Sequence, residues 1–280
     1  MSVPETTSGR WDSEYHAPVL ADEVVALLSN ARTVLDGTLG GGGHSLALLM
    51  SGARVTAVDR DPQAIETARQ RLASYEALGQ FETVLGNYAD VDAIPALAGR
   101  TFEGILLDLG VSSHQLDDPS RGFSFRAGVP LDMRMGVDAD RDAAGLLNTA
   151  EEIELGAIRG ALGPRTGPPD FARLFQAVRI AVNDEIGGLE RALDALRERL
   201  TPGGTFAVIA YHSGEDRVVK NAFRDWSTDC ICPPRQPVCT CRGRALGTLL
   251  TRKPTTASPE EADRNPRARS ARLRAWRSAL

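Results

Sequence analysis

A glycine-rich turn at residues 36–45 is the clearest sign of chemistry in this chain of 280 residues. An apolar run ends at Asp36, and residues 37–45 then read GTLGGGGHS. Glycines let the backbone approach a ligand closely, and the amides of a helix that begins there face the ligand. Dinucleotide and flavin proteins share such a turn, and a purely structural tight turn is the alternative. We therefore expect a nucleotide-like cofactor at a turn that includes Asp36 and Gly40.

Two side chains after the next apolar runs extend this prediction. Asp59 ends a run about twenty residues beyond the turn, where an acid commonly accepts hydrogen bonds from ribose hydroxyls. NAD and S-adenosylmethionine both carry these hydroxyls, and the alternative role for Asp59 is a second helix cap beside Asp61. Tyr88 follows the third run and either flanks an adenine or packs as an ordinary aromatic side chain.

Residues 108–118, DLGVSSHQLDD, follow the fourth apolar run. In open α/β sheets ligands bind beyond the carboxyl ends of the strands, so this polar loop lies where a substrate meets a cofactor. Its aspartates and serines suit hydrogen bonding to an amine, whereas a dehydrogenase would more often have His, Lys or Tyr here. A simple cluster of turn residues is the alternative. His212, in the segment YHSGEDR after a later strand, is expected at the same rim.

Arginines are concentrated in three places. Residues 121–126 (RGFSFR) and 130–135 (PLDMRM) interleave arginines with aromatic side chains and methionines. This composition suits RNA, because guanidinium groups contact phosphates and aromatic rings stack on bases, but an arginine-pinned buried loop is an equal alternative. The tail at residues 264–277 holds six arginines, which either track phosphates or form a solvated charged face.

All four cysteines lie in one short segment as two C-x-C pairs, Cys230 with Cys232 and Cys239 with Cys241. Such a cluster indicates a zinc site or a set of reduced thiols that bind nothing. The spacing differs from the two-residue spacing of familiar zinc knuckles.

The elements that must position these residues follow from the apolar pattern: short β-branched runs alternate with helical patterns, as in a parallel α/β sheet. Strands are predicted at 33–36, 54–59, 81–85, 104–109 and 205–210, with two late strands at 246–251 and 271–276 pairing as an antiparallel hairpin. Asp61-Pro62 predicts the start of a helix, because Asp is a good N-cap and Pro is favoured at the first helical position. Further helices are expected at 190–200 and 215–226.

The alternation stops between residues 135 and 200, where apolar residues recur at helical spacing. We expect a helical insertion there, interrupted by a loop at 163–169. The predicted domains are a cofactor-binding domain formed by 1–134 and 200–280, and a helical substrate-recognition insertion at 135–199.

Overall composition limits the class of protein. Hydrophobic residues make up 42% of the chain, enough for a full-sized core, and no apolar run approaches the length of a membrane span. The polar, acidic start is unlike a signal peptide, so we expect a cytoplasmic protein that does not contact membranes. The formal net charge of −5 gives no bulk sign of nucleic-acid binding.

Taken together, these segments resemble the MraW (RsmH) family of 16S rRNA cytosine-N4-methyltransferases. The matching blocks, in order, are 15–20 (YHAPVL), the glycine-rich turn, 59–62 (DRDP), 108–116, 121–126, 130–135, 175–185 (FQAVRIAVNDE), 212–220 and 265–274 (NPRARSARLR). They cover most of the chain.

The resemblance implies a class I S-adenosylmethionine-dependent methyltransferase fold, Rossmann-like, with a seven-stranded sheet, an antiparallel terminal hairpin and an all-helical insertion that is shortened here. It also implies a cytosine in the decoding region of small-subunit rRNA as substrate, the 30S subunit as partner and roles in ribosome biogenesis, with a homodimer left open. The family's cofactor positions fall on Gly42, Gly43, His44, Asp59, Tyr88, Asp108 and Gln115.

The corresponding chemistry is transfer of a sulfonium methyl group to the exocyclic amine of cytosine, without a metal ion. We expect Asp108, Ser112 and Ser113 to orient this amine, with Asp132 or His212 as alternative proton acceptors. Two other classes remain open: a non-catalytic relative that binds cofactor and RNA, and an NAD-dependent dehydrogenase, which the acid before the glycine-rich turn disfavours.

Overall fold

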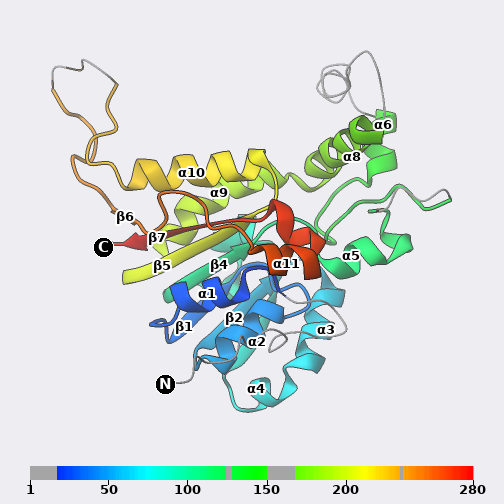
Figure 1. The fold of residues 1–280 in the computed structure, drawn as a ribbon, viewed down its shortest axis with the longest axis horizontal. Helices are drawn as coiled ribbons and strands as arrows, with labels where there is room; N and C mark the ends of the chain where they lie inside the picture. Colours follow the sequence, from blue (N-terminus) through cyan, green and yellow to red (C-terminus); the bar gives the residue numbers. More distant parts are fainter. Residues whose placement is uncertain (1–17, 124–127, 150–167, 234–235, 237, 280) are drawn as a thin grey trace.

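The computed structural model describes residues 18–123, 128–149, 168–233, 236 and 238–279. Its centre is a seven-stranded sheet of order β3-β2-β1-β4-β5-β7-β6 (Figure 1). Strands β1 to β5 run parallel, and β7 pairs antiparallel with both β5 and β6. This confirms the predicted class I methyltransferase fold. The strands are β1 Thr33–Asp36, β2 Arg54–Asp59, β3 Phe81–Leu85, β4 Phe102–Asp108, β5 Leu200–Ala210, β6 Gly247–Leu249 and β7 Arg272–Ser278.

Helices cover both faces of the sheet (Figure 1). One face carries α1 (Ala21–Leu27), α2 (Gly43–Met50) and α3 (Pro62–Arg71), followed by the short α4 (Ala73–Ala77). The opposite face carries α9 (Glu185–Glu198) and α10 (Ser213–Trp226), with the 3-10 helices η1 (Tyr88–Ala93) and η2 (Pro95–Leu97). Near the carboxyl end of the chain, α11 (Pro259–Arg264) and η4 (Pro266–Ser270) precede β7.

Alternating side chains along the strands divide the core between these two layers, because successive residues of a strand point to opposite faces. Leu35 and Leu107 belong to the cluster under α9 and α10, whereas Val34 and Leu106 belong to the cluster under α1, α2 and α3. Trp276 of β7 is fully buried and packs edge-on against Trp226 of α10, with ring centroids 5.1 Å apart. The late strand is therefore part of the core.

Most predicted elements are confirmed, and their local causes are visible. Asp61 caps α3 by accepting the Gln63 amide at 3.0 Å. The two late strands pair as predicted, although β7 lies inside the sheet and only β6 is at its edge. Strand β5 begins earlier than predicted, at Leu200, because the segment Pro202-Gly203-Gly204 lies within the strand, at an irregularity of its pairing with β4.

The helical insertion projects from one end of the sheet (Figure 1). It contains α5 (Ser113–Asp117), η3 (Pro119–Arg121), α6 (Ala143–Thr149) and α8 (Pro168–Asn183). Its apolar side chains form a separate cluster that includes Phe123, Met133 and Val178. Residues 163–167 of the predicted loop lie outside the described residues. Residues 168 and 169, also predicted as loop, instead begin α8.

Helix α9 does not belong to this separate cluster. It begins at Glu185, five residues before its predicted start, and its Leu189, Leu193 and Leu196 are buried in the main core against the sheet. The domain division predicted from sequence, with the insertion at 135–199, remains a proposal. The packing of Phe123 in the insertion cluster and of α9 in the main core favours an insertion that begins before residue 135 and ends near residue 183. Among the described helices, none has the length and apolar character needed to span a membrane.

Candidate active site

A cavity of about 370 Å³ lies at the carboxyl ends of the parallel strands. Its volume is within the range of small-molecule sites. One side of its wall is the glycine-rich turn and Asp59, and the other side includes Gln176, Arg179 and Asn183 of the insertion. Of the residues predicted from sequence, the wall includes Gly40, Gly43, His44, Asp59, Tyr88, Asp108, Ser112, Gln115 and His212.

The glycine-rich turn is held from beneath by Asp36. This carboxylate is buried, accepts the Ser45 hydroxyl at 2.7 Å and accepts the Thr38 amide at 3.1 Å. Burial raises the pKa of Asp36, and the Ser45 hydrogen bond opposes that rise. Gly42 has a φ of +74° and sits against α3, where a Cβ atom would meet Ala68 at 3.3 Å. Neither Asp36 nor Gly42 lines the cavity, and both shape the turn.

Asp59 connects the turn to the start of α3. Its Oδ2 accepts the Gly40 amide at 2.8 Å, and its Oδ1 accepts the Asp61 amide at 2.9 Å. Burial raises the pKa of Asp59 to about 6, and these two amide hydrogen bonds oppose the rise. Each carboxylate oxygen still has a lone pair that can accept a hydroxyl from the cavity. Asp59 can therefore hold the Asp61 amide and still accept a ribose hydroxyl, so the two roles considered from sequence are compatible.

Gln115 and Ser112 form a small network at the floor of the cavity. The Gln115 side chain accepts the Ser112 amide at 3.0 Å and donates to the Met135 carbonyl at 3.1 Å and to Asp61 at 3.3 Å. Gln115 is only 5% exposed. It therefore links two parts of the insertion, α5 and the segment at Met135, to the start of α3. The side chain of Ser113 lies outside the described residues.

Asp108 lies between the Tyr211 hydroxyl and the His44 ring. Its Oδ1 accepts the Tyr211 hydroxyl at 2.8 Å, and its Oδ2 lies 3.4 Å from His44 Nδ1. The other ring nitrogen of His44 faces the Val19 carbonyl at 2.8 Å, which can only accept, so Nε2 carries a proton. Burial raises the pKa of Asp108, and the charge of His44 opposes the rise. A carboxyl group with these contacts can hold an amine and take its proton.

His212 has a different role from the one predicted. It caps α10, and its Nδ1 accepts the amides of Gly214 and Glu215 at 3.2 and 3.4 Å. The ring proton is therefore on Nε2. This atom lies 3.2 Å from Glu215 Oε1 at an angle that makes no hydrogen bond, and it is buried without a hydrogen-bond partner among the described residues. Because its accepting nitrogen is already used, the expectation that His212 is a proton acceptor is corrected.

Asp132, the other predicted proton acceptor, does not line the cavity. Its carboxylate is held by Arg134 through two hydrogen bonds of 2.8 Å. The Arg134 hydrogen bond lowers the pKa of Asp132, which makes it a weaker base. The sequence placed Asp132 at the site because it could not show that Arg134, two residues away, binds it.

Several arginines of the arginine-rich segments bind protein carboxylates in the described structure. Arg121 binds Asp61 at 2.8 Å and the Met135 carbonyl at 3.1 Å, which favours the buried-loop alternative for this arginine. Residues 124–127 of the same segment lie outside the described residues. In the tail, Arg272 and Arg274 both bind Asp216 of α10, and the buried Arg274 is not available to track phosphates.

Several residues at the site had no assigned role from sequence. Asn183 donates to the carbonyls of Met133 and Arg179 and accepts the Met135 amide at 2.8 Å, which fixes the loop before α6 against α8. Arg179 holds Glu185 with two hydrogen bonds of 2.8 and 2.9 Å. Both arginine and asparagine lie in the segment FQAVRIAVNDE, but only the folded chain shows their partners.

The sheet order and a cofactor-sized cavity at its parallel carboxyl ends define a class I methyltransferase. Comparison with known proteins identifies the family: the chain belongs to the MraW methylase family, whose model matches residues 13–168 and 164–279. It is 58% identical to a protein of Gemmatimonas aurantiaca named ribosomal RNA small subunit methyltransferase H, over 99% of both chains.

A protein of the same name from Heliobacterium modesticaldum is 43% identical and matches over 93% of this chain and 97% of that protein. Among solved structures, the N-methyltransferase NodS from Bradyrhizobium japonicum aligns over 98% of this chain and 100% of its own, at a TM-score of 0.49 and 11% identity.

Proposed function

We propose that this S-adenosylmethionine-dependent methyltransferase modifies the N4 amine of a cytosine in the decoding region of small-subunit rRNA, within the 30S particle. The observation that carries the proposal is one shared cavity, whose wall combines the glycine-rich turn and Asp59 with Asp108, His212 and residues of the insertion. The names of the relatives support the small ribosomal subunit as the substrate particle.

The cavity wall fits this cofactor. Asp59 offers acceptors for the ribose hydroxyls, and Tyr88 offers an aromatic face for an adenine. Gly41 has no atom within 4 Å of the position a Cβ would take, so its backbone is open to a close-lying ligand. When bound, S-adenosylmethionine supplies an activated methyl group on its sulfonium.

The exocyclic amine of cytosine is a poor nucleophile, because its lone pair is delocalised into the ring. Asp108 compensates by accepting a hydrogen bond from the amine and then the proton that the amine loses as the new N–C bond forms. The Tyr211 hydroxyl holds the carboxyl group in place, and the His44 ring lies beside it. His212 supports the cavity wall from behind by capping the start of α10.

The test uses single-turnover methylation of 30S particles isolated from a strain that lacks the gene. Asp108→Asn keeps the size of the side chain but removes the proton acceptor, so the rate is expected to fall by about 10²- to 10⁴-fold. Asp263→Asn is the matched control, because this aspartate is 85% exposed and outside the cavity wall. Methylation by Asp108→Asn at the parental rate contradicts the role of Asp108.

The same assay separates the enzyme from a non-catalytic relative that binds cofactor and RNA. Transfer of a labelled methyl group to 30S particles, with the label mapped to an N4-methylcytosine, supports the proposed reaction. A parental protein that binds S-adenosylhomocysteine but transfers no label favours the non-catalytic alternative. A label on another atom or in another region contradicts the cytosine assignment but retains the methyltransferase.

A further inference from the structure

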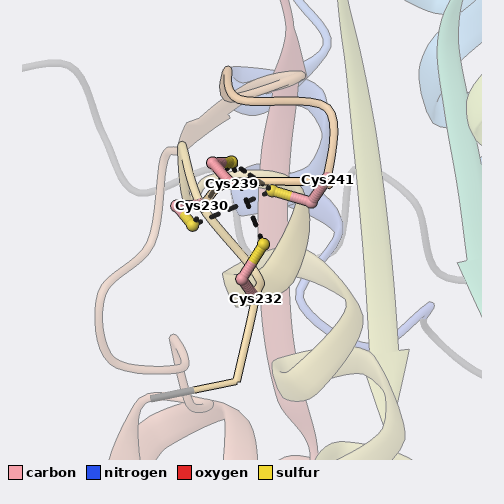
Figure 2. A group of neighbouring side chains, drawn as sticks. All are labelled: Cys230, Cys232, Cys239 and Cys241. Carbon is pink, nitrogen blue, oxygen red and sulfur yellow. Dashed lines mark hydrogen bonds between the residues drawn. The ribbon is translucent and has the colours of Figure 1, made fainter. Parts of the chain in front are cut away.

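The four cysteines gather in the connection between α10 and β6, at the opposite end of the sheet from the insertion (Figure 1). Figure 2 shows their side chains converging on one point. Two features of the sequence bring this about. Each pair is spaced as C-x-C, and in an extended segment residues i and i+2 point to the same side. The turn between the pairs then brings the two pairs together.

The spacing of the sulfur atoms is that of a tetrahedron. The Sγ atoms of Cys230, Cys239 and Cys241 form a face with edges of 3.8, 3.4 and 3.8 Å. The Sγ atom of Cys232 lies 3.8 Å from that of Cys239, and all four ligand atoms are within 4.8 Å of one another, so Cys232 lies out of the plane of this face. Four thiolates at about 2.3 Å from a central zinc ion would be separated by about 3.8 Å.

Neither disulfides nor a multinuclear iron cluster fits these distances. All four cysteines are free, and their separations are far longer than the bond of a disulfide, about 2.05 Å. A cluster of several iron atoms would spread its thiolates more widely than the observed spacing allows. Four thiols also gain little from packing here, because Cys230 and Cys239 are exposed and none of the four lies in the core.

We propose that Cys230, Cys232, Cys239 and Cys241 bind one zinc ion in a closed tetrathiolate site. Tetrahedral sulfur-only coordination selects zinc over oxygen-preferring cations. Four protein ligands leave no open position for substrate, and none of the cysteines lines the cavity, so the ion is structural. The amide of Ile231 donates to Cys241 Sγ at 3.4 Å, a contact that helps to offset the negative charge of a tetrathiolate.

The site would fasten the connection between α10 and the edge strand β6. Two hydrogen bonds already join the two ends of this connection. The Leu246 amide donates to the Trp226 carbonyl at 2.7 Å, and the Ala245 amide donates to Asp229 at 3.0 Å. Beyond these two hydrogen bonds, the described residues of the loop have no buried apolar cluster of their own. A metal ion supplies the missing cross-link.

The experiment measures the metal content of the full-length protein, purified under reducing conditions without chelator, by inductively coupled plasma mass spectrometry. About one zinc per chain is expected. Cys232→Ser and Cys241→Ser are expected to reduce zinc to background, whereas the control Thr240→Ala, which alters the same loop but only a hydrogen bond to Gln236, retains it. Replacement of zinc by cobalt(II) is expected to give the visible and near-ultraviolet bands of a tetrahedral tetrathiolate.

Binding of S-adenosylhomocysteine to each variant, measured by calorimetry, shows whether the variant is folded, and this readout does not depend on the site. Three results would overturn the proposal: parental protein without zinc whose four thiols react freely, two disulfides under the same reducing conditions, or iron in place of zinc. Zinc retained by both serine variants would overturn the assignment of the ligands.

Discussion

The proposed role of Asp59 as acceptor of the ribose hydroxyls ties cofactor binding to its ionisation. The hydroxyls would donate to the ionised form, whereas burial raises the pKa of Asp59 to about 6 in the free protein. We therefore predict that the affinity for S-adenosylhomocysteine is constant above about pH 7 and weakens as the pH falls through about 6. Calorimetric titration between about pH 5 and about pH 8 measures this dependence.

The variant Asp59→Asn provides the control for this prediction. It cannot ionise, so its affinity should be weaker by about tenfold or more at neutral pH, and the dependence near pH 6 should disappear. An unchanged pH dependence in the variant would assign the titration to another group. The raised pKa also has a stability consequence: the free protein loses folding free energy as pH rises from 3.8 to about 6, because the folded state holds this proton more tightly.

At the scale of elements, Arg121 joins the insertion to α3. Its partner Asp61 has only 4% of its side chain exposed, so removal of the arginine leaves a buried carboxylate without its cation. Arg121→Met is predicted to lower the free energy of unfolding by about 3 kcal/mol, measured by urea denaturation. Arg69→Met is the control, because the Arg69–Glu76 pair is largely exposed and is worth about 1 kcal/mol or less. Equal losses of unfolding free energy in Arg121→Met and Arg69→Met would contradict the role of Arg121 in joining the insertion to α3.

Asp216 joins α10 to β7 through Arg274 and Arg272, at 2.7 and 3.1 Å. Burial alone would raise its pKa, but the two arginines outweigh burial and lower the pKa below 3.8. The contribution of Asp216 to stability is therefore present above pH 3.8 and is lost as the pH falls through the lower folded-state pKa.

We predict that Asp216→Asn lowers the free energy of unfolding by about 3 kcal/mol at neutral pH, because Asp216 and Arg274 are both about nine-tenths buried. The difference from the parental protein should shrink as the pH falls from 3.8 through the lower folded-state pKa, because the carboxyl of the unfolded chain is protonated first. Urea denaturation at several pH values tests this, with the exposed Asp225→Asn as control. A difference that stays constant into acid would show that the loss is one of packing alone.

The elements that are predictable from sequence are those with a local cause. Strand β2 and helix α3 are confirmed because the run of apolar residues and the Asp61-Pro62 start signal lie within a few residues of one another. The predicted start of α9 is too late, because its first turn begins after Asp184, a residue with φ of +48° that no common start signal marks.

The candidate site is predicted less completely, because its contacts join residues far apart in the sequence. The glycine-rich turn, Asp59 and Asp108 are recognisable from their positions after strands, and all three border the cavity. The Tyr211–Asp108 hydrogen bond spans 103 residues, and the Asn183 contact with Met133 spans 50. Such pairs depend on the completed sheet. Conversely, Asp132 looks accessible in sequence, and only the structure shows its pairing with Arg134.

At the scale of the whole molecule, the cavity lies between two cores of unequal size. The sheet is packed by large clusters on both faces, whereas the insertion has a small separate cluster around Met133 and Val178. Regions with few buried apolar side chains open more often than the main core. We therefore predict that amide hydrogen exchange in the described part of α8 is faster than in α9, even though the two helices adjoin in sequence.

Cofactor binding should reduce this difference. Gln176, Arg179 and Asn183 of α8 line the same cavity as Asp59, so a ligand that bridges the wall stabilises the closed arrangement by mass action. Exchange measured by mass spectrometry with and without S-adenosylhomocysteine should slow at residues 176–183, while exchange in the buried segment of β4 stays unchanged because it is already slow. Exchange in α8 that is as slow as in α9 without ligand would show that the insertion is part of the main folding unit. Ligand that slows exchange only in the glycine-rich turn would show that the insertion does not close on the cofactor.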